Sequence, residues 1–280
     1  MLSLKASVEV FQEPTFYAQL YCDPYNRRIR IDQYRGDLTE LHRVVCEKAT
    51  QLSAEKIIIK VRQEHIKTFL TLGYSIEGVI DGYYRGSDAW MLSLFLHDSR
   101  RNSLYHRQED EVIEKIQHLP YVGNGSSANT LKKAGYEDAK GLAELYRETF
   151  KIYPVPLHEE EYIKQSMDEG TIFYFFEEEG KIISAASAEI NKEEKNAELT
   201  DCATDPAYRK GGLMKQLLAQ LEADLKREGI FCYYSLARAL SFGMNAAFKQ
   251  LNYSYRGRLL NNCYIYDKME DMNIWVKTIN

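Results

Sequence analysis

The sequence lacks the features that mark membrane-spanning, secreted, metal-binding and nucleic-acid-binding proteins. No apolar run approaches the ~18 residues that crossing a bilayer requires, and the N-terminus lacks the apolar core and cleavage site of a secretory signal. The six histidines show no metal-ligand spacing. The net charge is −5, whereas neutralising nucleic-acid phosphates needs a basic surface. We therefore expect no metal, no membrane and no nucleic-acid partner.

Cysteine is also scarce. The five cysteines are an odd number, lie far apart and form no C-x-x-C pair. We interpret them as reduced, buried, small apolar side chains rather than catalytic groups. Together with the missing secretory signal, they predict a cytoplasmic protein.

Two common phosphate-binding motifs are missing as well. The chain has no G-x-x-x-x-G-K-[ST], and no G-x-G-x-x-G with an acidic residue about twenty positions further on. The sequence therefore argues against nucleotide hydrolysis and against nicotinamide binding.

What is present suits a soluble globular chain of one large or two ordinary domains. Its 280 residues are 45% hydrophobic and 28% charged. Short β-rich runs alternate with helical patterns in both halves of the chain. A polar helix at about 106–118 and the loop GNGSSAN lie between the two halves. We predict an N-terminal domain (1–97), a helical linker (98–129) and a C-terminal domain (130–280). The chain is expected to end with strands YSYRGRLL (253–260) and NCYIYDK (262–268).

The two domains share letters at one helix–strand junction. The stretch FLTLGYSIEGVI (69–80) aligns without gaps on FKQLNYSYRGRL (248–259), since 248 − 69 and 257 − 78 give the same offset. The matches include Phe69 with Phe248, Tyr74 with Tyr253, and Gly78 with Gly257. A chance match is the alternative, but the agreeing order of the flanking elements favours a genuine repeat.

One stretch, ATDPAYRKGG, places two basic residues and two glycines just before a helix predicted at 212–228. The first turn of a helix has free backbone N–H groups and the positive end of the helix dipole. Gly211 and Gly212 let a ligand approach that backbone closely, and Arg209 and Lys210 add positive charge. Together they predict a cradle for an anion, best suited to a diphosphate. An ordinary strand–helix turn is the alternative.

The corresponding stretch of the N-terminal domain, YRGDLTELHRVV, has an acidic residue at the helix start. Asp37 is a good N-cap, so its side chain occupies the N–H groups that a phosphate needs, and its charge repels a diphosphate. We hypothesise that residues 1–97 are a degenerate copy that binds no coenzyme and serves as scaffold and as a wall of the substrate pocket.

The order strand, DPAYRKGGLM, helix, strand, helix ending FKQLNY resembles the GNAT acetyltransferase superfamily over about residues 130–268. In its signature Q/R-x-x-G-x-G/A, Arg209 and Gly212 match, whereas Met214 stands where Gly or Ala is usual. The resemblance implies a mixed α/β fold with a strongly twisted sheet flanked by helices, here preceded by a degenerate half-copy. It also implies acetyl-CoA as cosubstrate, with its pantetheine arm beside Cys202, Ala203 and Thr204. Its pyrophosphate is expected on Arg209, Lys210, Gly211, Gly212, Leu213 and Met214.

A closer likeness lies in YPVP (153–156), ELTDCAT (198–204), SLARALSFGMN (235–245) and GRLLNN (257–262). With the extra N-terminal domain, these stretches resemble the β-lysine N-epsilon-acetyltransferase subgroup. The resemblance implies transfer of acetyl from acetyl-CoA to the side-chain amine of β-lysine, which yields a compatible solute used in osmoadaptation. The rivals are acetylation of another small amine (a polyamine or lysine) and a catalytically weak coenzyme-binding regulatory module. Oligomeric state, a homodimer included, is left open.

The target amine has a pKa of about 10 and arrives protonated, so a group must take its proton before nitrogen attacks the thioester. Glu198 lies six residues before Thr204, where several superfamily members carry their general base. Alternation along the strand places Glu198 and Thr204 on one face and Asp201 on the other unless a bulge intervenes. We favour Glu198 over Asp201 as base; either could instead bind the cationic amine, and a solvated strand-edge glutamate is the further alternative.

A tyrosine on the following helix commonly protonates the departing thiolate in this superfamily. Phe248 stands at that position as a cofactor contact without a hydroxyl, so the role is vacant or passes to Tyr233, Tyr234 or Tyr253. A thiol leaves tolerably as thiolate, so loss of the acid need not be fatal.

Five further side chains are candidates for binding the two substrates. Ser241 and Asn245 are candidate contacts to the pantetheine arm, with helix capping as the alternative for Ser241. Arg238 and Arg258 are candidates for a bidentate clamp on the substrate carboxylate, with ordinary surface arginines as the alternative. Tyr153, in the YPVP turn, is a candidate substrate contact.

Overall fold

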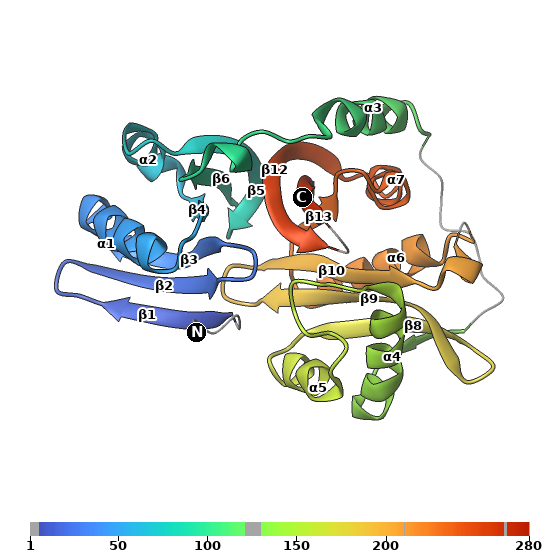
Figure 1. The fold of residues 1–280 in the computed structure, drawn as a ribbon. Coiled ribbons are helices and arrows are strands. Elements are labelled where there is room, and N and C mark those ends of the chain that lie inside the picture. Colours follow the sequence, from blue (N-terminus) through green and yellow to red (C-terminus); the bar gives the residue numbers. More distant parts are fainter. Residues whose placement is uncertain (1–5, 121–129, 210, 266–267, 280) are drawn as a thin grey trace.

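A single sheet of 13 strands runs through both halves of the chain (Figure 1). The computed structural model describes residues 6–120, 130–209, 211–265 and 268–279; the predicted loop GNGSSAN and the candidate Lys210 lie outside them. The strands are β1 (Ser7–Gln12), β2 (Phe16–Asp23), β3 (Arg28–Gly36), β4 (Lys56–Val61), β5 (Ser75–Tyr84), β6 (Ser87–Phe95), β7 (Leu131–Lys133), β8 (Ile172–Glu178), β9 (Lys181–Asn191), β10 (Asn196–Thr204), β11 (Cys232–Arg238), β12 (Ser254–Ile265) and β13 (Lys268–Thr278). The helices are α1 (Leu38–Gln51), α2 (Ile66–Thr71), α3 (His106–Gln117), α4 (Ala139–Thr149), α5 (Glu160–Asp168), α6 (Leu213–Arg227) and α7 (Phe242–Gln250).

The two halves of the sheet have the same topology. The strand order is β1-β2-β3-β4-β6-β5 in the N-terminal half and β8-β9-β10-β11-β13-β12 in the C-terminal half, where the short strand β7 is added at the outer edge beside β8. In each half the first three strands are antiparallel, and the third and fourth are parallel. The halves join where β5 pairs with β12 through Gly78 and Gly257. These glycines are matched in the sequence repeat, so equivalent positions meet at the junction.

The local packing of the repeat is also the same in both copies. Phe69 meets Tyr74 edge-on with ring centroids 5.1 Å apart, and Phe248 meets Tyr253 at the same distance. A Cβ on Gly257 would lie 2.3 Å from the carbonyl oxygen of Glu77, so a side chain there would force the joining strands apart. The repeated letters therefore mark a repeated structural junction.

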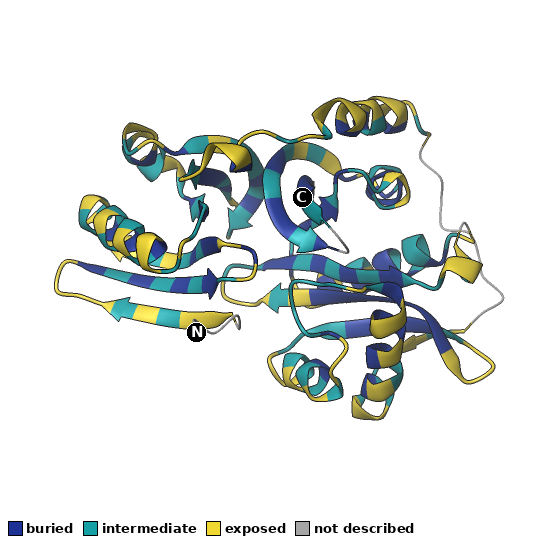
Figure 2. Cartoon of the chain, viewed as in Figure 1, coloured by how far each residue is buried: buried dark blue, intermediate teal, exposed yellow. Residues whose placement is uncertain are grey.

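Helices cover both faces of the C-terminal half. On one face α6 buries a stripe of leucines at four-residue spacing against the sheet, including Leu217, Leu221 and Leu225, and α7 packs beside it. Helices α4 and α5 cover the opposite face (Figures 1 and 2). In the N-terminal half, α1 and α2 cover one face. None of the described helices combines the length and apolar character needed to cross a lipid bilayer.

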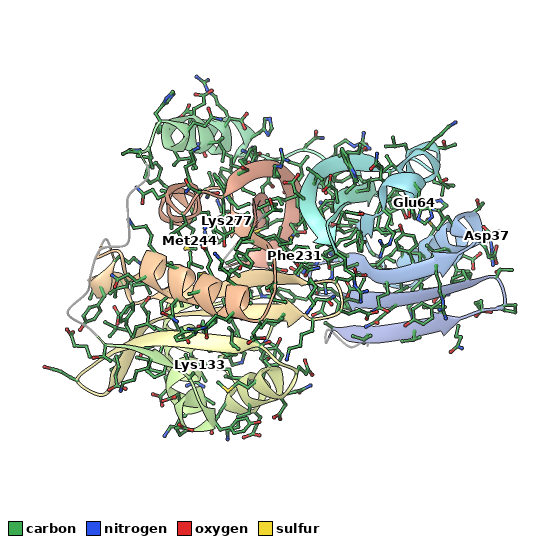
Figure 3. The ribbon with its side chains drawn as sticks, turned by 180° about the vertical axis from the view of Figure 1, so that it is seen from behind. Asp37, Glu64, Lys133, Phe231, Met244 and Lys277 are labelled. Atoms are coloured by element: carbon green, nitrogen blue, oxygen red, sulfur yellow. The ribbon has the colours of Figure 1, made fainter. Side chains whose placement is uncertain are left out.

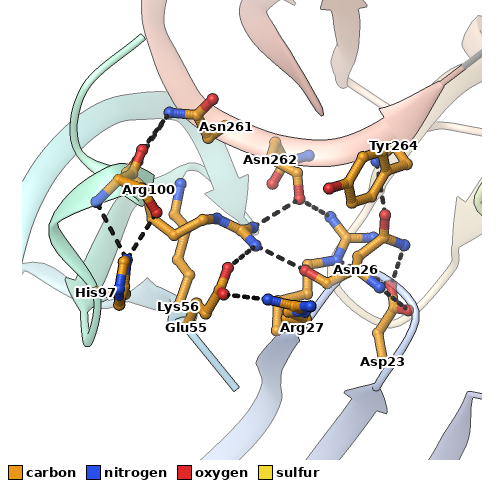
Figure 4. Close-up of polar contacts among 12 residues, drawn as sticks. Asp23, Asn26, Arg27, Glu55, Lys56, His97, Arg100, Asn261, Asn262 and Tyr264 are labelled. Atoms are coloured by element: carbon orange, nitrogen blue, oxygen red, sulfur yellow. Dashed lines mark hydrogen bonds and ion pairs between the residues drawn. The ribbon is translucent and has the colours of Figure 1, made fainter. Parts of the chain in front are cut away.

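Buried polar groups tie the two halves together near β12 (Figure 4). Arg28 Nη1 donates to the carbonyl of Asn262 at 3.1 Å, and the Asn26 side chain accepts from the backbone N–H of Tyr264 at 2.6 Å. Lys56, with no exposed side-chain surface, pairs with Glu77 at 2.8 Å and donates to a backbone carbonyl of β12. Because an unpaired buried charge is costly, these contacts hold the halves in one arrangement.

The C-terminal strands differ from the prediction. From Ser254 to Ile265 the stretches expected as two strands form one long strand, β12, whose register shifts between Leu259 and Cys263. Asn261 has a φ of 42° at this irregularity. In the sequence, the polar pair Asn261–Asn262 resembles a turn between two strands. The expected second strand runs on through 266–267, which lie outside the described residues, to Lys268, where β13 begins. The last strand is instead β13, between β11 and β12. Its charged residues Glu270 and Asp271 are buried, which hid its strand character.

Helix α3, predicted at about 106–118, joins the halves and presses a buried acid onto β13. Glu109 is 1% exposed, and its Oε2 accepts from Arg258 Nη1 at 3.3 Å. Burial, together with a hydrogen bond and repulsion from the carboxyl of Asp271, raises the pKa of Glu109 to about 8. Glu109 is therefore protonated in the folded protein at neutral pH.

This raised pKa predicts a pH-dependent stability. The stabilising contribution of protonated Glu109 is complete below its unfolded pKa of 4.5 and is lost as the pH rises toward 8. Glu109→Gln mimics the protonated carboxyl, so we expect its Tm to decline less than the wild-type Tm between pH 5 and 8. Glu111→Gln on the same helix, a partly exposed position, is the control. Parallel Tm curves for Glu109→Gln and wild type would contradict the assignment.

Candidate active site

The candidate site lies where two neighbouring parallel strands separate. Strands β10 and β11 pair only from Asn196 with Cys232 to Glu198 with Tyr234, and then diverge. A cavity of about 840 Å³ opens beyond that point, between Thr200–Thr204 of one strand and Ser235–Arg238 of the other. The start of α6, helix α7 and the segment after α4 close its remaining sides. The unpaired backbone groups of the facing strand edges are available to a ligand that enters this opening.

The head of α6 borders the cavity and has the properties predicted for an anion cradle. Gly212 is the N-cap of α6 with a φ of 75°, and as a glycine it has no side chain that could cap the helix. Arg209 is exposed beside it, and its Nε donates to the carbonyl of Thr204 at 3.2 Å. The backbone N–H groups of the first turn therefore remain available for phosphate oxygens.

The equivalent helix in the N-terminal half is capped, as predicted. Asp37 accepts from the backbone N–H groups of Thr39 and Glu40 at 2.9 and 3.0 Å. Figure 3 labels Asp37 at the head of α1, far from Met244 of the cavity. The two copies of the fold thus differ at the helix head in the way that decides whether a diphosphate can bind.

The counterpart of the cavity in the N-terminal half is occupied by Tyr34. Its hydroxyl lies 3.0 Å from His65 Nδ1 and accepts from the backbone N–H of Arg62 at 3.3 Å. Its ring meets Phe69 edge-on at 5.8 Å, whereas the repeat partner of Phe69, Phe248, lines the cavity of the C-terminal half. A tyrosine therefore fills the space that remains open in the other copy.

A β-bulge places Asp201 in the cavity wall. The register of β10 against β9 shifts between Thr200 and Ala203, and Asp201 has a φ of 50°. Asp201 accepts hydrogen bonds from the Ser187 hydroxyl at 2.7 Å and the Tyr153 hydroxyl at 3.2 Å. Burial raises the pKa of Asp201 to about 6, although both hydrogen bonds lower it and Glu198 raises it further. A carboxylate with such a pKa can exchange protons near neutral pH.

The bulge corrects the predicted strand faces. Ser187 lies opposite Thr200 on β9, on the face that also carries Glu198, so the bond from Ser187 places Asp201 on that side. Glu198 is partly buried beside its strand partners Glu189 and Tyr234 and is not among the cavity-lining residues. Both acids thus lie on one face, and of the two Asp201 lies nearer the reaction space.

Most of the other predicted site residues line the cavity, and some do not. Those in the lining are Tyr153, Cys202, Thr204, Arg209, Gly212, Leu213, Met214, Arg238, Ser241 and Phe248. Gly211 is exposed outside it, and Ala203 is buried under α4. Asn245 is fully buried, and its side-chain oxygen accepts from Asn273 and from the Trp275 ring nitrogen, so it joins α7 to β13.

The two predicted clamp arginines are far from equivalent. Arg258 is 7% exposed and pairs with Asp110 of α3 at 2.9 Å, outside the cavity lining. Its role in the fold is to hold the linker helix. Arg238 lines the cavity but pairs with buried Glu270 at 2.7 Å.

The three tyrosines offered as replacement general acids are buried outside the cavity lining of the described chain. The Tyr233 hydroxyl donates to the carbonyl of Ile230 at 3.2 Å. Burial and the nearby Glu222 raise the pKa of Tyr253 well above its ordinary value, so its proton is held tightly. The geometry therefore offers no side-chain hydroxyl from this set to the departing thiolate.

Sequence reasoning missed several polar residues of the site. Ser187 orients Asp201, while Thr149, Lys215 and Ser235 line the cavity. Ser187 could not be found without the register of β9 on β10. Thr149 ends α4 just before the YPVP turn, and no motif marks it.

A parted pair of strands beside an uncapped helix head is the arrangement that the GNAT resemblance implied. A model of the acetyltransferase (GNAT) family matches residues 140–250. The chain belongs to the GNAT acetyltransferase family and has its mixed α/β fold, because three curated N-acetyltransferases that are 33–39% identical to it cover 80–92% of its length. It is an N-acetyltransferase whose acetyl donor is acetyl-CoA.

Three curated relatives match most of this chain. N-acetyltransferase YodP of Bacillus subtilis (strain 168) is 39% identical, with 92% of this chain and 94% of the relative covered. The beta-lysine N(6)-acetyltransferase of Methanosarcina mazei is 36% identical, with 80% and 91% covered. That of Methanococcus maripaludis is 33% identical, with 90% and 93% covered.

The contrast between the helix heads yields a prediction for coenzyme binding. Gly212→Ala places a side chain at a φ of 75° beside the phosphate-binding amides, so we expect the Kd of acetyl-CoA to rise about tenfold. Gly180→Ala carries the same strain, at a φ of 78° in the β8–β9 turn, and should leave the Kd unchanged. Calorimetric titration should also give one site per chain, since Asp37 caps the other helix. Equal affinities for both variants would contradict the cradle.

Proposed function

We propose that this enzyme acetylates the side-chain amine of β-lysine, with Asp201 as the general base. One observation carries the choice of base: Asp201 sits on a bulge at the point where β10 leaves β11, buried and with its pKa raised to about 6. This geometry supports Asp201 over Glu198, the base that the sequence favoured. Glu198 is then left to bind charge on the substrate.

In this mechanism the amides at the head of α6 would hold the coenzyme pyrophosphate, and the open edge of β10 would hold its pantetheine arm. Bound acetyl-CoA supplies the thioester. The Tyr153 and Ser187 hydroxyls hold the Asp201 carboxylate in place. Asp201 accepts the proton of the substrate ammonium, directly or through water, and the freed amine attacks the thioester carbon. Backbone N–H groups of the bulged strand stabilise the developing oxyanion.

In this scheme the sulfur departs as thiolate, and the second proton of the attacking amine is released to water as the amide forms. A thiol of ordinary pKa, about 8.5, is a tolerable leaving group without a dedicated acid. Burial of Phe248 in place of a hydroxyl-bearing residue, with Tyr253 packed behind it, supports this view.

The identity of the amine is proposed from the relatives. Two of them are named beta-lysine N(6)-acetyltransferases, at 36% and 33% identity. We infer the same small-molecule substrate, β-lysine, for this enzyme. Its acetylated product would serve as a compatible solute in osmoadaptation, and the free cysteines suit a cytoplasmic location. In the same proposal residues 1–97 are a degenerate copy that binds no coenzyme, which the Asp37 cap and Tyr34 support.

A thiol-release assay over an amine panel tests this function. We expect turnover with β-lysine to exceed that with α-lysine, putrescine and spermidine, and mass spectrometry should find the acetyl group on the side-chain nitrogen. Preference for a polyamine would replace the substrate. No turnover of any amine, with acetyl-CoA still bound, would support the regulatory module instead.

The base assignment predicts different kinetics for two acids. Asp201→Asn should lower kcat by about 10²- to 10⁴-fold and remove the acid limb of the kcat/KM profile, which should have an apparent pKa near that of Asp201. Activity falls below this pKa because the base becomes protonated. Glu198→Gln should keep the limb and mainly raise KM for the amine. If Glu198→Gln abolished turnover while Asp201→Asn kept it, the base would be Glu198.

A further inference from the structure

Two acids lie side by side on the sheet near Asp201. Glu189 and Glu198 are direct partners across β9 and β10, an arrangement that destabilises a sheet when both are charged. Desolvation by the surrounding residues, together with the charges of Glu198 and Asp201, raises the pKa of Glu189, whereas the cations Arg30 and Lys60 lower it, so a bound ammonium group favours the ionised carboxylate. The side chain of Glu189 is nonetheless exposed, so a positively charged ligand can reach the pair.

The N-terminal half presents a basic residue at the equivalent position. Arg30 pairs with Ile58 two places after the first β3–β4 pair, as Glu198 pairs with Tyr234 two places after the first β10–β11 pair. Both lie on the face away from α1 or α6, because their neighbours Ile29 and Leu199 pack under those helices. Ile58 and Tyr234, the strand partners of Arg30 and Glu198, pack in one buried cluster, so the two halves meet on this face with opposite charges nearby.

Arg30 is oriented for a second carboxylate. Its Nε and Nη2 bind the carboxylate of Asp32, with Nη2 at 3.0 Å, and its guanidinium lies 4.8 Å from the centre of the Tyr21 ring. The Nη1 edge of the planar group therefore points away from Asp32. The side chain is 38% exposed, so a ligand can reach Arg30.

These charges adjoin the reaction cavity. Glu198 precedes Asp201 by three residues, about 10 Å along a strand, which is comparable to the length of an extended six-carbon diamino acid.

The cavity wall beside Asp201 also awaits a polar ligand. Thr149 lines the cavity and is only 9% exposed, and its buried hydroxyl has no hydrogen-bond partner within the described residues. A buried hydroxyl without a partner is costly unless a bound ligand completes its hydrogen bonding.

We propose that Arg30 binds the carboxylate of the substrate, while Glu189 and Glu198 bind its non-reacting ammonium group. The N-terminal half then selects diamino acids over simple diamines. This inference rests on the proposed function, since the side-chain amine must lie at Asp201 while the amino-acid end extends toward Arg30.

The test compares substrates that differ by one charged group. Arg30→Gln should lower kcat/KM for β-lysine about 10- to 100-fold through KM, and leave kcat/KM for 1,4-diaminopentane, which lacks the carboxylate, unchanged. Arg30→Lys should recover part of the loss, because it keeps the charge without the fork. Arg35→Gln is the matched control: Arg35 is on the same strand, 5.1 Å over the Tyr17 ring. Glu189→Gln should instead reduce the preference for β-lysine over 6-aminohexanoate, which lacks the second amine.

Each outcome has a separate meaning. An unchanged ratio between β-lysine and the diamine in both Arg30 variants would overturn the inference while leaving the acetyltransferase proposal intact. A wild-type enzyme that acetylates neither β-lysine nor α-lysine would overturn the proposed function itself. Because each ratio is measured on one protein sample, a loss of folded enzyme does not change it.

Discussion

Strands β10 and β11 remain paired for only three positions and then separate, and the chemistry of this enzyme depends on that separation. Paired strands would satisfy each other's backbone groups and leave no room for a coenzyme arm. The separation creates the cavity, and the bulge at Asp201 turns a carboxylate into its wall. The uncapped head of α6 lies at the same opening. One interruption of the sheet thus brings an anion site, exposed strand backbone and a proton acceptor together.

The same fold occurs twice, and small differences decide which copy binds the coenzyme. Asp37 caps the head of α1, whereas the equivalent helix α6 begins at Gly212 without a side-chain cap. Tyr34 fills the space in the N-terminal half that remains a cavity in the C-terminal half. The N-terminal copy keeps a structural role through buried pairs such as Lys56 with Glu77. It also carries Arg30 opposite Glu198, so in our proposal the copy without a coenzyme contributes to substrate choice.

Much of the fold could be predicted because its signals are local. The leucine spacing of α6, the N-cap at Asp37 and the repeat around Gly78 and Gly257 each lie within a few residues of sequence. The last strands could not be predicted in this way. An interior strand pairs on both edges and buries charged residues such as Glu270 and Asp271, so it has no polar face to reveal it.

The sequence by itself determined the helix heads, the glycines of the repeat and the set of acids from which a base is drawn, because these depend on neighbouring residues. Only the tertiary structure decided which acid enters the cavity, since one bulge shifts every later side chain of β10 to the other face. It also committed Arg258 to α3 and placed Arg30 across from Glu198. Such juxtapositions depend on strand register and on the contact between the halves, which no short stretch of residues encodes.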